Sequence, residues 1–435
     1  MADPADIAHL LRRTEFIARP TRVADLSPGT IAAAVVDILD FTPNANPTVP
    51  VALTVHDSNN AFGQSVDAFN WWIDSMATRL RPFQEKMTLF WHGHFVSEWD
   101  VVGRTDHMTQ QNQLYRTNAL GNLITLTQAM ALEPAMLIYL SNGVNYKTAP
   151  NQNFARELME LFTLGVGNYT EDDVVAAARA WTGYNYDYPT HQYEYRSTKH
   201  DGDPKTFFGT TKNWTGPETI TEILQDNVGK RLIAARFIAK KLWESLAYPK
   251  PADNIVNELA DVFITNNMEL KRLVEALLNR IEFYSPEAKQ GLVRTPTEWS
   301  VALLAHSGLT SSAVGLYSFA DRMGQVVFNP PNVAGWKNNN YWLTTSALSG
   351  RANVAKKVAS LLRANGGFDN TYAMTSADAV DFVATYFGVA PLATATRTAL
   401  INALQTERTS SGGGNSKATT NLLIEMMLTG EMNVA

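Results

Sequence analysis

The stretch NQNFARELMELFTLGVGNYTEDDVVAAARAWTG, residues 151–183, decides which fold class this chain belongs to. Its first half carries large apolar residues at intervals of three and four, the spacing of a stripe along one helix face. These residues are Phe154, Leu158, Leu161 and Phe162. Gly165 marks the end of that helix, and Thr170 with Asp173 has the pattern of a capping box at the start of the next. The stretch predicts two helices joined by a turn.

Similar patterns recur in both directions from this stretch. Asp3 before Pro4, and Ser27 before Pro28, place a capping side chain ahead of a proline in the first helical turn. The predicted helical runs are residues 65–79, 82–99, 106–140, 153–164, 170–182, 217–227, 230–247, 251–264, 268–283, 295–306, 311–323, 346–364, 376–387, 394–407 and 421–429. Alternating apolar and polar segments are scarce, so the fold class is mainly α.

The domain organisation follows from length and from one unusual segment. A chain of 435 residues with 45% hydrophobic content can bury a large core, so we expect a single large multi-helix domain over residues 1–365. Residues 366–435 are expected to form a small C-terminal helical lobe packed on it. The span of about residues 184–214 is long, polar and rich in tyrosine, with room for a short hairpin. Such insertions in compact domains are often functional covers.

Composition excludes several classes of function. Because 42 acidic and 36 basic residues are interspersed, for a net charge of -6, we expect neither nucleic acid nor an anionic membrane as a partner. The absence of cysteine excludes disulfides, zinc thiolate sites and cysteine nucleophiles. The sequence lacks GxGxxG after a strand, GxxxxGK[ST], HExxH and GxSxG, so nucleotide-binding, zincin and α/β-hydrolase functions lack support.

Location is predicted from the ends and the apolar runs. The start, MADPADIAHLLRRTEF, carries acidic residues at once and has no uninterrupted apolar segment. No stretch approaches the length of a membrane span. Cytoplasmic residence is therefore the default expectation.

The segment FWHGHFVSEWD, residues 90–100, is the first candidate for chemistry. In a regular helix, His92 and His94 would lie about 200° apart around the axis and could not share one metal ion without a local break. His94 and Glu98 are four apart and would share a face, which suits capture of a cation. Two interpretations stay open: the histidines are ligands, or they are hydrogen-bonded inside an aromatic core.

The second candidate lies in the opening stretch. Arg156 and Glu160 are spaced as a helical ion pair, and Glu157 points in a neighbouring direction. Two nearby carboxylates can serve as general acid and base, or as oxygen ligands for a hard cation. The alternative is a solvated helix face with a salt bridge.

Two further segments carry polar groups in turns. In KHDGDPKTFFG, residues 199–209, His200 and Asp201 stand in a turn around Gly202, where side chains can converge on a ligand or merely form the turn. In MGQVVFNPPNVAGWKNNNYW, residues 323–342, Trp336 stands among asparagines. Amides beside flat apolar faces suit a polar organic ligand such as a sugar. They equally suit a rigid loop that plugs a helical core.

These same segments resemble the bacterial family known as domain of unknown function 1800. The matching pieces are HLLRRTEF (9–16), FWHGHF (90–95), ALGN (119–122), PAMLIYLSN (134–142), NQNFARELMELFTLGVGNYTEDDV (151–174), KHDGDPKTFFG and MGQVVFNPPNVAGW (323–336). The resemblance covers about residues 9–355. It implies a largely helical fold, no established activity, and relatives that are often exported and encoded beside a second exported protein. The chain departs from the family in lacking an export signal, in Gln152, where relatives have glutamate, and in Thr14 and Glu15, which replace a glycine-containing turn.

The leading hypothesis for function is a metal-assisted hydrolase or related metalloenzyme. His92, His94 and His200, with Asp201 or Glu157, would hold a divalent metal ion. Glu157 or Glu160 would act as general base, and Arg156 completes the predicted catalytic set. Asn153, Tyr184 and Trp336 would contact a polar small molecule or a glycan.

Two alternatives come from other classes. A metal-free carbohydrate-active enzyme would use Glu157 and Glu160 as acid and base, with the tyrosine-rich insertion stacking on sugar rings. A non-enzymatic binding or assembly protein would instead use Arg156, Glu157 and the histidines as a buried structural network beside a protein partner.

Overall fold

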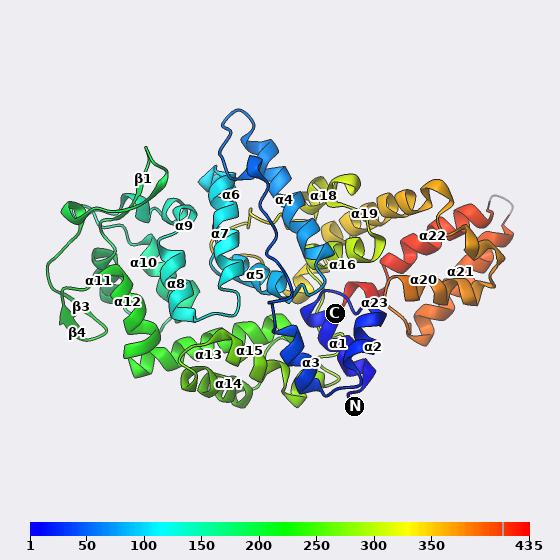
Figure 1. Ribbon diagram of the computed structural model, residues 1–435, viewed down its shortest axis with the longest axis horizontal. Helices are drawn as coiled ribbons and strands as arrows, with labels where there is room; N and C mark the ends of the chain where they lie inside the picture. Colours follow the sequence, from blue (N-terminus) through cyan, green and yellow to red (C-terminus); the bar gives the residue numbers. More distant parts are fainter. Residues whose placement is uncertain (411–412) are drawn as a thin grey trace.

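The computed structural model describes residues 1–410 and 413–435, and helices dominate it. The mainly α fold class is confirmed (Figure 1). The α-helices are α1 Pro4–Thr14, α2 Pro20–Leu26, α3 Ile31–Ile38, α4 Ala61–Thr78, α5 Phe83–His94, α6 Trp99–Val102, α7 Thr105–Thr117, α8 Leu123–Ala131, α9 Pro134–Tyr139, α10 Asn153–Glu157, α11 Glu171–Ala180, α12 Gly216–Thr221, α13 Val228–Leu246, α14 Asp253–Thr265, α15 Leu270–Leu278, α16 Pro296–Ser307, α17 Ser311–Val314, α18 Leu316–Met323, α19 Thr345–Arg363, α20 Ser376–Tyr386, α21 Thr394–Thr409, α22 Asn415–Met427 and α23 Gly430–Asn433.

Shorter helical segments connect or extend these helices. The 3₁₀ segments are η1 Val51–Leu53, η2 Asn142–Val144, η4 Ser197–Lys199, η6 Ile281–Tyr284, η7 Asn339–Trp342, η8 Ala364–Gly366 and η9 Asp369–Ala373, and the π-helical ones are η3 Leu158–Thr163 and η5 Glu222–Asp226. Across residues 1–410 and 413–435, no helix combines the length and apolar character needed to cross a membrane.

The tyrosine-rich insertion contains two hairpins at one end of the molecule (Figure 1). Strand β1 (Tyr184–Asp187) pairs antiparallel with β2 (Gln192–Tyr195), and β3 (Lys205–Phe207) pairs with β4 (Thr210–Lys212). The predicted insertion and short hairpin are confirmed, and a second hairpin accompanies the first.

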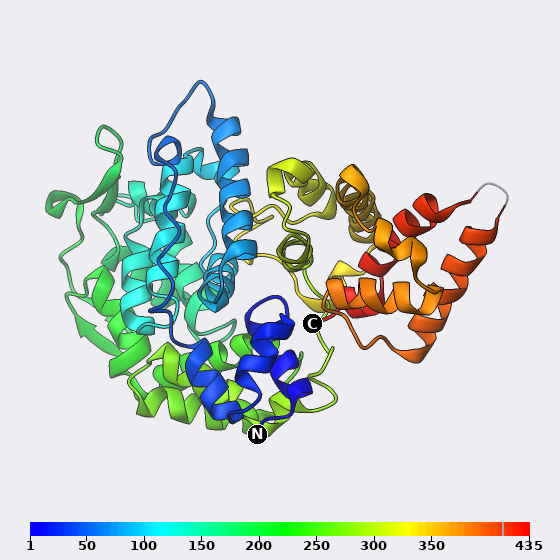
Figure 2. The same cartoon turned by 45° about the vertical axis from the view of Figure 1, so that its right-hand side comes forward.

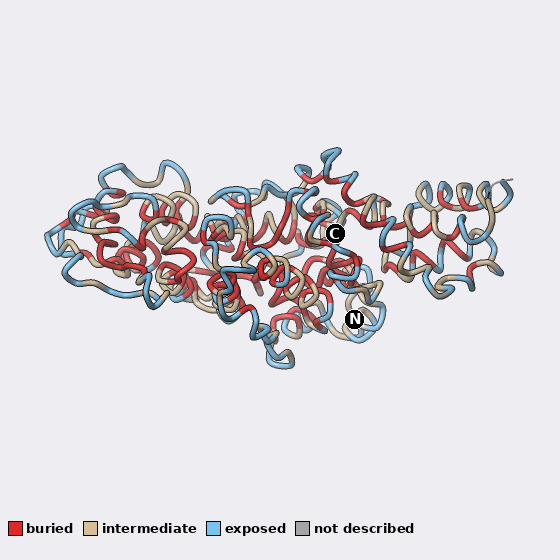
Figure 3. Tube along the Cα trace, turned by 90° about the horizontal axis from the view of Figure 1, so that it is seen from above, coloured by how far each residue is buried: buried red, intermediate tan, exposed pale blue. Residues whose placement is uncertain are grey.

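The apolar side chains form two clusters. One cluster contains residues of α1, α3, α5 and all the helices from α8 through α15. The other contains residues of α4 and all the helices from α16 through α22. Seen from above in Figure 3, buried positions run along the whole length of an elongated molecule. Helix α5 lies between the clusters, because Trp91 packs into the first while His92 faces Trp72 and Phe328 of the second.

Helices α20 to α22 lie together at the end of the molecule opposite the hairpins (Figures 1 and 2). Helix α23 returns to the centre, where Val434 bridges to Val293. The apolar residues of α20 to α22 share a cluster with α16, α18 and α19. The division of the chain at residue 365 stays a prediction, and residues 411–412 of the expected lobe lie outside the described residues.

Four predicted helical runs are interrupted within the described residues, and two of them, 268–283 and 311–323, divide into α15 with η6 and into α17 with α18. The run 82–99 ends at His94, because Phe95 has φ -98° and ψ 75° and the Trp99 N–H bonds to the carbonyl of Phe328 instead of continuing the helix. The run 106–140 becomes α7, α8 and α9, with Asn122 and Glu133 capping the second and third. The shared helix face predicted for His94 and Glu98 is therefore wrong.

A buried ionic network fixes α5 against its neighbours. The fully buried Glu85 accepts hydrogen bonds from Arg116 Nε and Nη2 at 2.8 Å, from Arg79 Nη1 at 2.5 Å and from Trp72 Nε1 at 2.9 Å. Although burial alone raises the pKa of Glu85, the two guanidiniums hold it below its usual range. This network links α4, α5 and α7 through one carboxylate.

Candidate functional site

The end of helix α5 meets the π-helix η3. A π-helix bonds each N–H five residues back, and the last carbonyls of any helix lack partners within it. Two of these carbonyls are used here: His94 Nε2 donates to the Phe162 oxygen at 3.0 Å and Lys241 Nζ donates to the Leu161 oxygen at 3.3 Å. His94 Nδ1 is left as an acceptor, and Lys241 Nζ lies 3.1 Å from it. His94 and Lys241 thus join α5, η3 and α13.

His92 occupies a separate aromatic environment on the other side of α5. Its Nε2 accepts the N–H of Phe328 at 3.0 Å, and its ring lies 5.5 Å from that of Trp336 and 5.2 Å from that of Trp72. Burial lowers the pKa of His92 to about 3, so this imidazole is neutral. His92 is therefore hydrogen-bonded inside an aromatic core, where it accepts a hydrogen bond from the segment before Trp336 and helps to position it.

Gly335 allows that segment to approach α5. Gly335 has φ +73°, and a Cβ atom placed on it would lie 2.4 Å from the carbonyl oxygen of Gly93. Only glycine fits both the left-handed backbone and the close contact. Gly335 thus brings Trp336 against the end of α5, which carries His92, Gly93 and His94.

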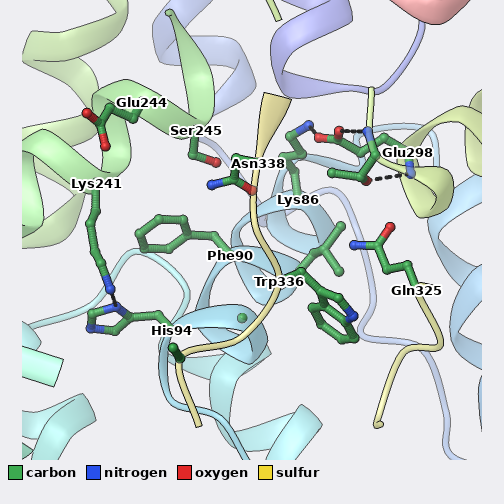
Figure 4. A pocket seen from close by; sticks show the side chains of 14 residues that line it. Lys86, Phe90, His94, Lys241, Glu244, Ser245, Glu298, Gln325, Trp336 and Asn338 are labelled. Carbon is green, nitrogen blue, oxygen red and sulfur yellow. Dashed lines mark hydrogen bonds and ion pairs between the residues drawn. The ribbon is translucent and has the colours of Figure 1, made fainter. Parts of the chain in front are cut away.

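A cavity of about 190 Å³ opens where these elements meet (Figure 4). It lies between α5, α13, the start of α16 and the loop before η7. Its lining residues are Lys86, Leu89, Phe90, Gly93, His94, Lys241, Glu244, Ser245, Thr295, Glu298, Gln325, Ala334, Trp336 and Asn338. Figure 4 shows Lys241 with His94 at one side and Lys86 with Glu298 at the other, with Phe90 and Trp336 between them. The cavity thus combines two aromatic faces with amide, hydroxyl and charged groups.

Lys86 and Glu298 form the buried ion pair of the cavity. Glu298 belongs to a capping box at the start of α16, in which its carboxylate accepts the Thr295 N–H at 2.9 Å. Burial lowers the pKa of Lys86 although Glu298 opposes this, while Lys86 and Thr295 hold the pKa of Glu298 below its usual range in spite of burial. Each group thus opposes the effect of burial on the pKa of the other.

A smaller cavity of about 40 Å³ adjoins the first and shares with it Lys86, Glu244 and Glu298. Arg13 and Arg294 line it as well. Arg13 donates to the carbonyls of Ala247 and Ala288, and Arg294 donates to those of Phe16 and Met432. Burial lowers the pKa of Arg13 to about 9 and that of Arg294 to about 10, so both remain protonated at neutral pH.

Lys241 is a second lysine of the larger cavity, and it is partly buried. Burial lowers the pKa of Lys241 to about 8, and Glu244 one turn along opposes this. Among the described residues it has no carboxylate within ion-pair distance. Burial and the Lys241 charge lower the pKa of His94 well below its usual value, so the imidazole beside the ammonium is neutral.

The predicted metal ligands do not meet. In the part of the chain that the structure describes, no group of three or more His, Asp or Glu side chains could hold a metal ion. His92 and His94 face different clusters across α5. His200 donates from Nδ1 to the Thr182 oxygen at 2.8 Å, and Asp201 pairs with Arg179 at 2.6 Å. The latter two secure the hairpin insertion to the end of α11.

The predicted catalytic residues lie on a more open surface. Arg156 pairs with Glu171 at 2.7 Å across the turn, so its predicted pairing with Glu160 is wrong. The reason is that η3 changes the helical repeat, and Glu160 instead accepts a hydrogen bond from the hydroxyl of Tyr169. Glu157 is half-buried, and burial together with Glu160 raises its pKa. The capping box of Thr170 and Asp173 is confirmed.

The predicted substrate-binding residues are dispersed. Trp336 lines the cavity with His94. Asn153 is exposed at the start of α10. Tyr184 is buried on β1 with its ring 5.1 Å from that of Trp181, and burial raises its pKa to about 12. Of the predicted residues, the cavity therefore gathers His94 and Trp336.

Sequence reasoning missed most of the charged lining. Glu298 had a readable signal, since TPTE at residues 295–298 is a capping box that follows the first-turn proline rule. Lys241 follows Phe237 and Ile238 by four and three positions, which puts a lysine on the apolar face of α13. Lys86 and Arg13 carried no local signal that separates them from surface cations.

Comparison with protein-family models agrees with the family resemblance of these sequence segments. A family model described as "Protein of unknown function (DUF1800)" matches residues 9–430. The chain belongs to the DUF1800 family. The comparison with curated proteins and that with solved structures found no match. The family model reaches α23, beyond the about residue 355 over which the resemblance was visible in the sequence.

Proposed function

We propose that this DUF1800 protein binds a polar, ring-bearing small molecule, of which a sugar is the simplest class, in the cavity between α5, α13 and α16. The observation that supports this proposal is the lining, in which Phe90 and Trp336 stand beside the polar side chains of Ser245, Gln325 and Asn338. Ligand sites commonly combine apolar or aromatic walls with a few placed polar groups. Aromatic faces pack on the apolar face of a sugar ring while amides and hydroxyls bond its hydroxyls.

The position of the cavity supports the same proposal. It lies where the two apolar clusters meet, and such boundaries are frequent places for ligand sites. It also joins sequence blocks that are far apart, namely the segments around residues 90, 241, 298 and 336. Binding, rather than turnover, is the part of function that this geometry supports directly.

The functions predicted from the sequence stay predictions. A metal-assisted hydrolase needs ligands that converge, which the described residues do not provide among His92, His94, His200 and Asp201. A carbohydrate-active enzyme that uses Glu157 and Glu160 would act outside the cavity, since neither residue lines it. The third hypothesis, a non-enzymatic binding or assembly protein with a protein partner, also stays a prediction.

Ligand-observed NMR with neutral and acidic mono- and disaccharides tests the proposal. We expect at least one sugar to bind, and Trp336→Ala to weaken it about tenfold or more, because the variant removes a flat apolar wall. Tyr341→Ala is the matched control, since Tyr341 is exposed on the same loop region and does not line the cavity.

The same samples separate the proposal from a metalloenzyme. Binding that persists after dialysis against EDTA, with no stoichiometric metal detected by mass spectrometry, supports a site made of protein groups. Loss of binding on chelation would favour the metal hypothesis. Failure of every sugar to bind, or equal loss in the Tyr341→Ala control, contradicts the proposal.

A further inference from the structure

The side chains that line the two adjoining cavities include more basic than acidic groups. Among the described residues that line them, Lys86, Lys241, Arg13 and Arg294 are basic, whereas Glu244 and Glu298 are acidic. Arg351 adds a fifth buried cation beside them, because its Nη2 donates to the Arg294 oxygen at 2.6 Å. Glu298 is the carboxylate whose charge acts on Arg13, Arg294 and Arg351 together.

Most of these cations have no anionic partner of their own. Within residues 1–410 and 413–435, Lys86 is the only one of the five that forms an ion pair. The arginines donate to main-chain carbonyls, which satisfy hydrogen bonds but do not neutralise charge. Buried charge without a counter-charge is costly, typically several kcal/mol.

Donors also remain unused at this place. Trp336 Nε1 is buried and has no hydrogen-bond partner among the described residues. Arg13 Nε also has no partner among these residues, although the Arg13 side chain lines the smaller cavity and is almost fully enclosed. Unused buried donors beside uncompensated cations are the chemistry of an acceptor-rich, negatively charged group.

We infer that the ligand of the cavity carries an acidic group, a carboxylate, phosphate or sulfate ester, which is held by Lys241 while its ring packs on Phe90 and Trp336. This inference rests on the proposed function and names its ligand class. A neutral sugar leaves the cation excess in place, whereas an acidic one offsets it. Glu298 pairs with Lys86 and does not neutralise all of the other cations.

Calorimetric titration of the full chain with four probes tests this inference. The probes are glucuronate, glucose 6-phosphate, glucose and inorganic phosphate. We expect at least one acidic sugar to bind about tenfold or more tighter than glucose, because a charge-assisted hydrogen bond adds that much affinity. The two acidic sugars distinguish a carboxylate from a phosphate site.

Variants of opposite sign locate the effect. Lys241→Gln removes a cavity cation and should weaken binding of the acidic sugar about tenfold more than it weakens binding of glucose. Glu244→Gln removes a cavity anion and should tighten the acidic sugar. Lys240→Gln is the matched control, because Lys240 is the exposed neighbour on the same helix and does not line either cavity. If Lys241→Gln does not fold, two other measurements test the same inference. They are the tighter binding of the acidic sugar expected for Glu244→Gln, and a loss of its affinity when salt is added.

The outcomes separate this inference from the proposed function. Equal affinity for glucose and both acidic sugars overturns the acidic ligand and leaves the sugar site standing. Binding of phosphate alone, sensitive to Lys241→Gln, supports an anion site and overturns the ring-bearing ligand. Binding of none of the probes overturns both.

Discussion

Glu85 illustrates how single charged residues determine this fold. Its carboxylate is fully buried between Arg79 and Arg116 and also accepts the indole N–H of Trp72. Such a residue has more effect on stability than any surface ion pair, because its partners have no water to return to. These buried polar residues thus hold α5, the helix that carries His92, Gly93 and His94, in place.

We predict that Glu85→Gln lowers the free energy of unfolding by about 3–5 kcal/mol, since it leaves two buried guanidiniums without a counter-charge. Urea denaturation measures this. Glu258→Gln is the control, because the Glu258 side chain in its pair with Arg280 is 60% exposed, and a change within about 0.5 kcal/mol is expected there. Equal effects of the two variants would mean that the network is not the source of stability.

His9 gives a prediction about pH. Burial, Arg13 and Arg12 lower its pKa to about 3, while its Nε2 donates to the Phe283 oxygen at 2.8 Å. The unfolded value is about 6.5, so the stabilising effect is complete above about pH 6.5 and is lost as the pH falls toward 3. His9→Gln keeps a donor and should reduce the slope of stability against pH between about 6 and 4 by about 1.4 kcal/mol per unit. Identical slopes for parent and variant would contradict this.

At the scale of elements, the site depends on the end of α5, on η3 and on the segment before η7. Helix α5 stops at His94, η3 has a π-helical repeat, and the segment before η7 approaches α5 through Gly335. Each irregularity exposes backbone or side-chain groups that a regular helix would conceal. The cavity forms where such irregular ends meet the faces of α5 and α13 that carry Phe90 and Lys241.

We predict that Gly335→Ala weakens ligand binding and lowers stability by more than about 2 kcal/mol, because a Cβ atom adds a clash with the Gly93 oxygen to the cost of positive φ. Gly324→Ala is a matched control, since Gly324 has φ +82° and open space around its Cβ position. It should cost only the backbone term of about 1–2 kcal/mol. The difference in melting temperature and in ligand affinity between the two variants measures the contact, and no difference would argue against it.

At the scale of the whole molecule, Arg294 connects the ends of the chain. It donates to the Phe16 oxygen at 3.1 Å and to the Met432 oxygen at 3.0 Å, and it lies beside the cavities between the two apolar clusters. Arg294 therefore ties the segment after α1 to α23 at the edge of the smaller cavity.

We predict that Arg294→Met lowers the free energy of unfolding by about 2–3 kcal/mol, because two buried carbonyls lose their donor. Differential scanning calorimetry measures the change. Arg322→Met, at an exposed position, is the control and should stay within about 0.5 kcal/mol. A parent-like melting curve for Arg294→Met would show that the two ends are held by other contacts.

The sequence by itself determined the mainly α class, the capping box at Thr170, the hairpin within the insertion and the DUF1800 resemblance. These features are local, because apolar spacing, caps and turn residues act within a few positions of one another. It also identified Trp336 and His94 as residues of interest from their polar and aromatic neighbourhoods.

Only the tertiary structure decided which of those residues share a site. Helix α5 ends at His94, where Phe95 leaves helical dihedral angles and the chain goes on to bond Trp99 to Phe328, and Arg156 pairs with Glu171 beyond the π-helical η3. Lys86, Lys241 and Glu298 come together across more than 200 positions of sequence. A lysine that enters a cavity and a lysine that enters water have the same local pattern, and packing between distant helices is the physical difference between them.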